Sequence, residues 1–82
     1  MIKVLFFGQL KEQLGVAGTE VYIEHSVTVS QLLERMIKTH PQWAQNLNNE
    51  SLLVAVDQVM AKLDALVSES SEVAFFPPVT GG

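Results

Sequence analysis

The residues with the clearest chemical potential stand at the end of the chain, where residues 77–82 read Pro-Pro-Val-Thr-Gly-Gly. A carboxylate is a poor electrophile, so a chain end takes part in acyl transfer only after activation, for example as an acyl-adenylate. Gly81 and Gly82 have no Cβ, so the backbone can pass through a narrow channel in any dihedral state. The proline pair stiffens the base of this arm, which can reach at most roughly 20 Å. The pattern predicts an arm that presents Gly82 to another protein; the alternative is a tail that is merely flexible.

Other catalytic or metal-binding signatures are missing from the sequence. There is no cysteine, which excludes disulfides, thiolate metal sites and thiol nucleophiles. His25 and His40 lie fifteen residues apart without clustered acids, so we interpret them as a surface residue and a helix-end residue. We interpret Asp57 and Asp64 as turn residues rather than as general bases. A chain of 82 residues is also too small for both a core and a substrate cavity, so we expect no cofactor or metal bound by this chain.

Composition indicates one small globular domain. Hydrophobic residues make up 48% of the chain and charged residues 17%. The net charge is -4 with only five Lys and Arg, which disfavours binding to nucleic acid. The apolar run near Met1 is far below spanning length, so no membrane association is expected. Absence of cysteine is typical of a reducing compartment, and we expect a cytoplasmic protein.

The first part of the chain predicts a hairpin. Residues 2–7 alternate so that Ile2, Val4 and Phe6 share the core face, whereas the other face carries Lys3, Leu5 and Phe7. Residues 9–14 suit one or two helical turns ended by Gly15, and residues 20–24 suit the returning strand.

The clearest element is an amphipathic helix over residues 29–37, whose apolar stripe is Val29, Leu32, Leu33, Met36 and Ile37. Thr28 and Gln31 have capping-box spacing, and the helix is expected to end at His40-Pro41. Residues 41–50 are expected to be irregular, with Trp43 covering one end of the core.

The second half predicts three strands. Residues 52–56 form a continuous apolar strand, expected to be central in the sheet. Asp57-Gln58 is a candidate two-residue turn into a short strand at residues 59–60, while residues 61–66 give no clear pattern. Residues 73–76 form the last strand, which the proline pair ends.

This element order predicts an α+β fold: a β-grasp (ubiquitin-like) mixed sheet with one main helix packed across one face. We divide the chain into a domain at residues 1–76 and an extended arm at residues 77–82. Leu5, Phe7 and Phe76 should form an outward apolar patch with Met60 beside them. Such patches mark protein interfaces; the alternative is that a loop covers them.

The beginning of the chain, Met-Ile-Lys-Val-Leu-Phe-Phe-Gly, and its end, Glu72 to Gly82, resemble the small sulfur-carrier subunits of molybdopterin synthase, the MoaD family. One departure is Ser70-Ser71, where that family often has a Gly-Asp turn. The resemblance implies a non-catalytic carrier whose terminal glycine is adenylated by an ATP-dependent enzyme of the ubiquitin-E1 type and converted to a thiocarboxylate. It also implies a heterotetramer with the large synthase subunit, whose active site receives the tail and builds the dithiolene of molybdopterin.

Carried over residue by residue, the resemblance gives Gly82 the acyl role and Gly81 the threading role. It places Phe7, Met60 and Phe76 at the hydrophobic contact with the large subunit, and Lys11 where the family often has a basic contact residue. The remaining interface residues are expected to be Leu5, Pro77, Pro78, Val79 and Thr80. Two alternatives stay open: a sulfur carrier for another pathway, such as thiazole synthesis for thiamin, and a ubiquitin-like tag or interaction module.

Overall fold

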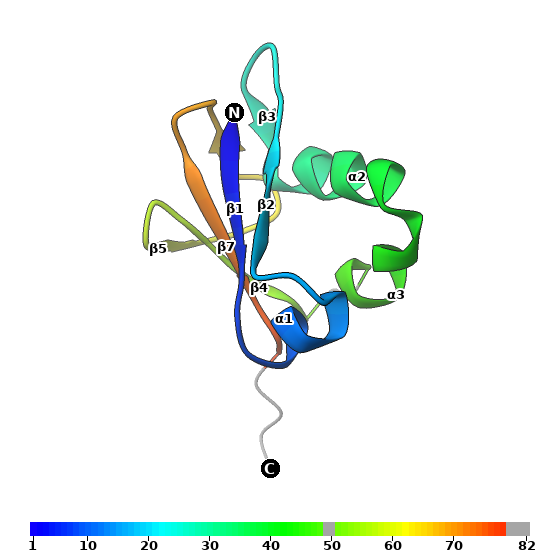
Figure 1. Cartoon of the computed structure of the whole chain (residues 1–82). Helices are drawn as coiled ribbons and strands as arrows, with labels where there is room; N and C mark the ends of the chain where they lie inside the picture. The colour runs from blue at the N-terminus through cyan, green and yellow to red at the C-terminus, as the bar shows by residue number, and fades with distance from the viewer. Residues whose placement is uncertain (49–50, 79–82) are drawn as a thin grey trace.

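The computed structural model describes residues 1–48 and 51–78 (Figure 1). Its elements, in chain order, are β1 Ile2–Phe6, α1 Gly8–Leu14, β2 Gly18–Val21, β3 Val27–Thr28, α2 Val29–Thr39, the 3₁₀ helix η1 Pro41–Trp43, α3 Ala44–Leu47, β4 Leu53–Val56, β5 Val59–Ala61, β6 Leu66–Val67 and β7 Glu72–Phe76. The predicted division into a domain and an arm stays a prediction, because residues 79–82 lie outside the described residues.

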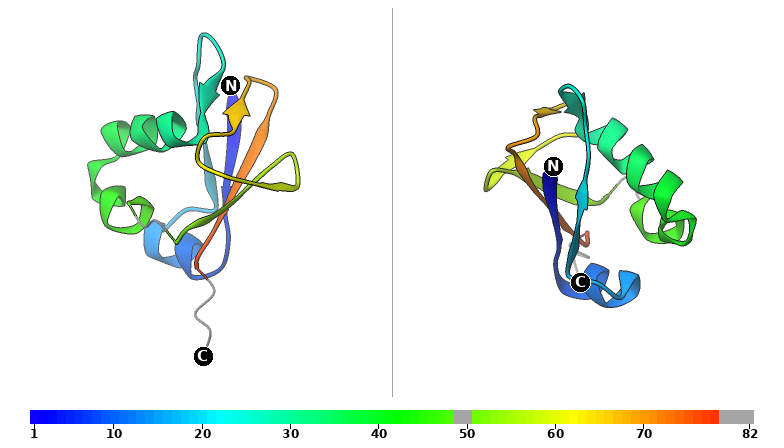
Figure 2. Two further views of the ribbon diagram at one scale, coloured as in Figure 1. Left: turned by 180° about the vertical axis from the view of Figure 1, so that it is seen from behind. Right: turned by 45° about the horizontal axis from the view of Figure 1, so that its top comes forward.

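The main sheet has the strand order β2-β1-β7-β4-β5. β1 and β7 run parallel in its centre, and the other neighbouring pairs are antiparallel. The helices lie to one side of this sheet (Figure 2). The α+β, β-grasp prediction is therefore confirmed, and so is the hairpin of the first two strands.

Helix α2 spans Val29–Thr39 and ends at its C-cap residue His40, so it begins and ends where predicted. The Thr28 hydroxyl accepts a hydrogen bond from the Gln31 backbone N–H at 3.1 Å, and the Gln31 side chain accepts one from the Thr28 N–H at 2.9 Å. This reciprocal pair satisfies two backbone donors that a helix start otherwise leaves unpaired. The side chains of Val29, Leu32, Leu33 and Met36 are buried, so the helix packs its apolar stripe on the sheet.

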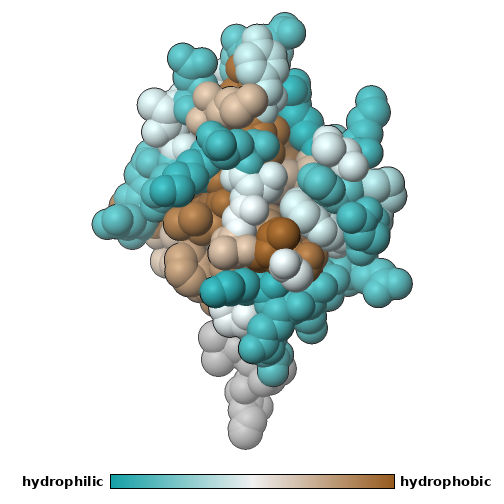
Figure 3. Space-filling model, in the orientation of Figure 1, coloured by the Kyte–Doolittle hydropathy of each residue, from teal (hydrophilic) through white to brown (hydrophobic). Residues whose placement is uncertain are grey.

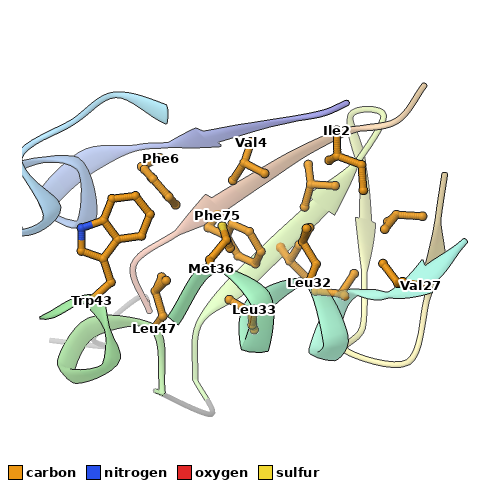
Figure 4. Packing of buried hydrophobic residues seen from close by; sticks show 14 of the residues in the cluster. Ile2, Val4, Phe6, Val27, Leu32, Leu33, Met36, Trp43, Leu47 and Phe75 are labelled. Atoms are coloured by element: carbon orange, nitrogen blue, oxygen red, sulfur yellow. The ribbon is translucent and has the colours of Figure 1, made fainter. Parts of the chain in front are cut away.

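The core lies between α2 and the alternate residues of β1 and β7 (Figure 4). Ile2, Val4 and Phe6 are buried, as predicted. The Phe6 ring meets Trp43 edge to face, with ring centroids 5.4 Å apart. Trp43 is 6% exposed, which confirms that it covers one end of the core.

Several predicted boundaries were wrong. Strand β2 spans Gly18–Val21 rather than residues 20–24. Its pairing with β1 begins where Gly18 meets Leu5 and ends where Val21 meets Ile2, the first residue of β1. Residues 41–47 are helical rather than irregular, since Trp43 and Leu47, one turn apart, both enter the core. The two-residue strands β3 and β6 form a second small sheet that was not predicted.

The position of the fourth strand is confirmed, although its burial is not. Strand β4 begins at Leu53 and lies between β7 and β5, so it is an interior strand of the sheet. Leu53 is 37% exposed, so the apolar run does not mean burial on both faces. The turn at Asp57 and Gln58 is confirmed: both residues have positive φ, and Val56 pairs with Val59 across it.

Candidate functional site

The base of the arm is fixed where β1 and β7 end side by side. The Phe7 N–H donates to the Phe75 carbonyl at 3.1 Å, which continues the pairing one residue beyond β1. The rings of Phe7 and Phe76 stack, with centroids 5.0 Å apart and planes 11° from parallel. The stack holds the last residue of β7 against the residue that caps α1. Pro77, the first residue of the predicted arm, therefore follows directly after this stacked pair.

Gly8 makes room for the arm. Its φ is +60°, and a Cβ at this position would lie 3.3 Å from Cγ of Pro77. A side chain here would be strained by its dihedral angle and would also push against the first proline. Sequence reasoning missed the contact between Gly8 and Pro77, because it depends on the parallel pairing of β1 with β7.

A groove of about 280 Å³ lies beside the arm, between α1 and α3. It is lined by Gln9, Leu10, Gln13, Gln45, Asn46, Leu52, Pro77 and Pro78. The Asn46 amide donates to the Gln13 side-chain oxygen at 3.0 Å and so ties the two helices together. None of these side chains ionises, so the groove offers hydrogen bonds and apolar contact but no acid–base group.

The face of the sheet opposite α2 carries a row of apolar side chains. Leu5 on β1 is the register partner of Ala74 on β7. Ala74 is the partner of Ala55 on β4, and Ala55 is the partner of Met60 on β5. Residues in register share a face of the sheet, so this row crosses four neighbouring strands. The two middle residues are alanines, whose side chains are short, so the surface is shallower between Leu5 and Met60.

A second row lies one pleat nearer the arm, where Phe76 is the register partner of Leu53 and stacks on Phe7. We call the two rows together the open face: Leu5, Phe7, Leu53, Ala55, Met60, Ala74 and Phe76. Met60 is 61% exposed and Phe7 43%. Figure 3 shows hydrophobic residues gathered over the sheet with hydrophilic residues around them. An exposed apolar surface with a polar border is typical of a protein interface.

The far end of the open face is charged. Lys3 is the register partner of Glu20 on β2 and of Glu72 on β7. The Glu72 N–H donates to the Asp57 carboxylate at 2.9 Å, and the Asp57 N–H donates to the Glu72 carbonyl at 2.8 Å. Asp57 thus anchors the start of β7, in agreement with its interpretation as a turn residue rather than a general base.

The structure brings together four of the predicted interface residues. Leu5, Phe7, Met60 and Phe76 all belong to the open face, which confirms the predicted orientation of the first and last strands. The interface role itself stays a prediction. Sequence reasoning missed Leu53 and Ala55, because the uninterrupted apolar run in which they lie hides which residues point outward.

The other predicted site residues lie elsewhere. Lys11 is exposed on α1, apart from the open face. Pro77 and Pro78 line the groove beside the arm. Val79, Thr80, Gly81 and Gly82, which carry the predicted acyl chemistry, lie outside the described residues.

Neither histidine belongs to a candidate metal centre. His25 is exposed, and the His40 ring stacks on Trp43 at 4.0 Å. Within residues 1–48 and 51–78, no three His, Cys, Asp or Glu side chains gather as metal ligands would. No helix in this part of the chain is long and apolar enough to cross a membrane.

The sheet is mixed, carries one main helix across one face and an apolar open face on the other, and its last strand ends beside α1. This arrangement defines a β-grasp protein. Solved structures support this class. Small archaeal modifier protein 1 of Haloferax volcanii has a TM-score of 0.80 at 23% identity, covering 95% of this chain and 97% of that one. A complex of subunits 1 and 2 of molybdopterin-converting factor from Helicobacter pylori contains a chain with a TM-score of 0.64 at 18% identity, covering 99% and 97%.

Sequence comparison identifies the family. The model of the ThiS family matches residues 4–82, so the chain belongs to the ThiS family. It is 45% identical to the molybdopterin synthase sulfur carrier subunit of Escherichia coli K12 over the full length of both chains. It is 38% identical to the protein of the same name from Haemophilus influenzae, again over the full length of both.

Proposed function

We propose that this chain is a sulfur-carrier subunit of molybdopterin synthase. The observation that carries the proposal is 45% identity to a protein of that name, over all 82 residues and the full length of that protein. The described structure supports the proposal because it offers a docking surface and a fixed base for an arm. It offers no acid–base group in the groove beside that arm.

The chemistry takes place at the carboxylate of Gly82. A carboxylate oxygen attacks the α-phosphate of ATP on an activating enzyme of the E1 type, forming the acyl-adenylate and releasing pyrophosphate. A sulfur nucleophile then displaces AMP, and the C-terminal glycine becomes a thiocarboxylate. Gly81 allows the backbone to enter the activating and accepting sites without a side chain in the way. ATP and sulfur come from the other proteins, and this chain binds no cofactor of its own.

The partner that accepts the sulfur is the large subunit of molybdopterin synthase, within a heterotetramer. We place this subunit on the open face, where Phe7, Phe76 and Met60 supply apolar area and Lys11 a basic contact at the side. Burial of such area contributes roughly 25 cal/mol per Å² before the costs of association. The stacked base of the arm limits the directions in which it can point, which lowers the entropy lost on insertion. The reaction takes place in the cytoplasm.

Intact-mass spectrometry tests this proposal. The full chain is incubated with ATP, an activating enzyme of this class and a sulfur source, with omission of ATP as the control. The expected result is the mass gain for replacement of one oxygen by sulfur, only when ATP is present. Isopeptide products on lysines would instead favour a ubiquitin-like tag, and the absence of any product would contradict the carrier proposal. Transfer to the thiazole of thiamin, with none to a pterin, would assign the chain to the other pathway.

A further inference from the structure

One groove of the described structure has no part in the proposed sulfur transfer. It is a groove of about 470 Å³ between the outer edge of β2 and the C-terminal half of α2. Strand β2 is one edge of the main sheet, so this groove lies on the opposite side of β1 from the central strand β7. A partner bound in it would leave the middle of the open face and the arm accessible.

Strand β2 directs backbone N–H and C=O groups that do not pair with β1 toward this groove. The Phe6 N–H donates to the Ala17 carbonyl at 2.8 Å, so Ala17 faces β1. Antiparallel pairing alternates along a strand, so Thr19 and Val21 also face β1. The peptide groups of Gly18, Glu20 and Tyr22 therefore face outward. The Tyr22 carbonyl confirms this alternation, because it accepts a hydrogen bond from the Arg35 guanidinium of α2 at 3.2 Å.

The groove has an apolar floor and a basic rim. Val21, half-buried, and Met36, 2% exposed, line its floor. Arg35 and Lys38 lie three positions apart on α2, so they stand on the same side of the helix, above the groove. They are two of only five Lys and Arg in a chain of net charge -4. Glu20 also lines the groove, but Lys3 is its register partner on β1.

We propose that this groove binds an extended acidic peptide segment of a partner protein, which pairs with β2 as an additional strand. The outward peptide groups of Gly18 and Glu20 would supply the main-chain hydrogen bonds. Alternate residues of an extended peptide point the same way. The segment would therefore place an apolar side chain over the half-buried Val21 and a carboxylate on each side of it, near Arg35 and Lys38.

Two other roles are possible for these features, and the test separates them. A small anion could occupy the basic rim without pairing with the strand. Charged side chains beside an edge strand can also serve only to prevent aggregation. Only the proposed peptide requires both the backbone of β2 and the charges of α2.

The experiment is an NMR titration of the full chain with the blocked peptide Thr-Glu-Thr-Val-Thr-Glu-Thr. We expect shifts of the amides of residues 18–22 and slower hydrogen exchange at Gly18 and Glu20. The peptide with both Glu replaced by Gln should bind more weakly. Absence of binding by the acidic peptide would overturn the proposal. Equal shifts with inorganic phosphate alone, without slower exchange at the edge, would overturn it in favour of an anion site.

Charge reversal on the protein gives a matched comparison. Lys38→Glu, which changes the net charge by the same amount as the control, should lower the affinity for the acidic peptide at least about fivefold, because one rim contact becomes repulsive. Lys62→Glu, an exposed residue just after β5, is the control and should keep the affinity. Equal loss in both proteins would overturn the proposal, since only net charge would then matter. Sulfur loading of Gly82 should be unchanged in both, which separates this surface from the proposed function.

Discussion

The two faces of the same sheet differ in what their residues do. On the face covered by α2, Val4, Val73 and Phe75 are completely buried. On the open face, Leu5, Ala74 and Phe76 come from the same two strands but keep part of their surface exposed. Because side chains alternate along a strand, one five-residue stretch contributes to folding with one set of residues and to recognition with the other.

This comparison teaches that hydrophobicity alone does not assign a residue to the core. Phe75 and Phe76 are neighbours of identical type, yet only Phe75 is shielded by α2. Truncating each residue should show whether it contributes mainly to stability or mainly to partner binding. Four experiments measure this difference for residues of the two faces and the arm. The expected effect on stability falls from the first to the last.

Phe75→Ala should lower the free energy of unfolding by about 3–5 kcal/mol, because it leaves a cavity in a packed core. Phe76→Ala, the matched control, should cost clearly less, because Phe76 is only partly buried. Urea denaturation followed by circular dichroism measures both. Equal losses would mean that the open face is also part of the core.

Gly8→Ala should cost roughly 1–2 kcal/mol through its left-handed backbone conformation. Gly15→Ala is the control, because Gly15 has a φ of +79° but no atom within 4 Å of an added Cβ. Both variants share the cost of the left-handed conformation, and Gly8→Ala adds the contact with Pro77, so its loss of stability should be the larger. Only Gly8→Ala, whose Cβ meets Pro77, should also slow sulfur transfer from the loaded carrier to the large subunit. Equal transfer rates would show that the position of Pro77 is not important.

Phe7→Ala should lower stability by clearly less than the roughly 3–5 kcal/mol of a core aromatic, because it removes the stack with Phe76 and only partial burial. It should weaken binding to the large subunit more than this, as measured by isothermal titration calorimetry. The control is Val16→Ala, because Val16 is similarly exposed, at 41%, but lies outside the open face. A core-sized loss of stability in Phe7→Ala would contradict the assignment of faces.

Deletion of Gly82 should leave the free energy of unfolding unchanged, because the core is complete with Phe75. It should abolish formation of the thiocarboxylate, because the adenylated residue is gone. Thermal unfolding and intact-mass spectrometry measure the two effects. A large drop in melting temperature would indicate that the C-terminal residue contributes to the fold.

Local sequence patterns predicted the elements whose stabilising hydrogen bonds and contacts lie within a short stretch of the chain. The stripe of α2 and its capping box appear in consecutive residues, and both are present in the structure. The Asp57-Gln58 turn also depends on a short stretch. The elements that were missed depend on distant partners: α3 has only four residues, and the strands β3 and β6 only two each. Such short segments carry no readable periodicity, so only their contacts stabilise them.

The sequence by itself determined the class of fold, the alternation of the first and last strands and the unusual ending of the chain. Only the tertiary structure decided which strands are neighbours. It placed β7 between β1 and β4, and thereby joined Leu5, Ala74, Ala55 and Met60 into one row. It also brought Gly8 against Pro77 and left the outer edge of β2 open beside α2. The physical reason is that alternation is a property of each strand, whereas a surface depends on register between strands that are far apart in the chain.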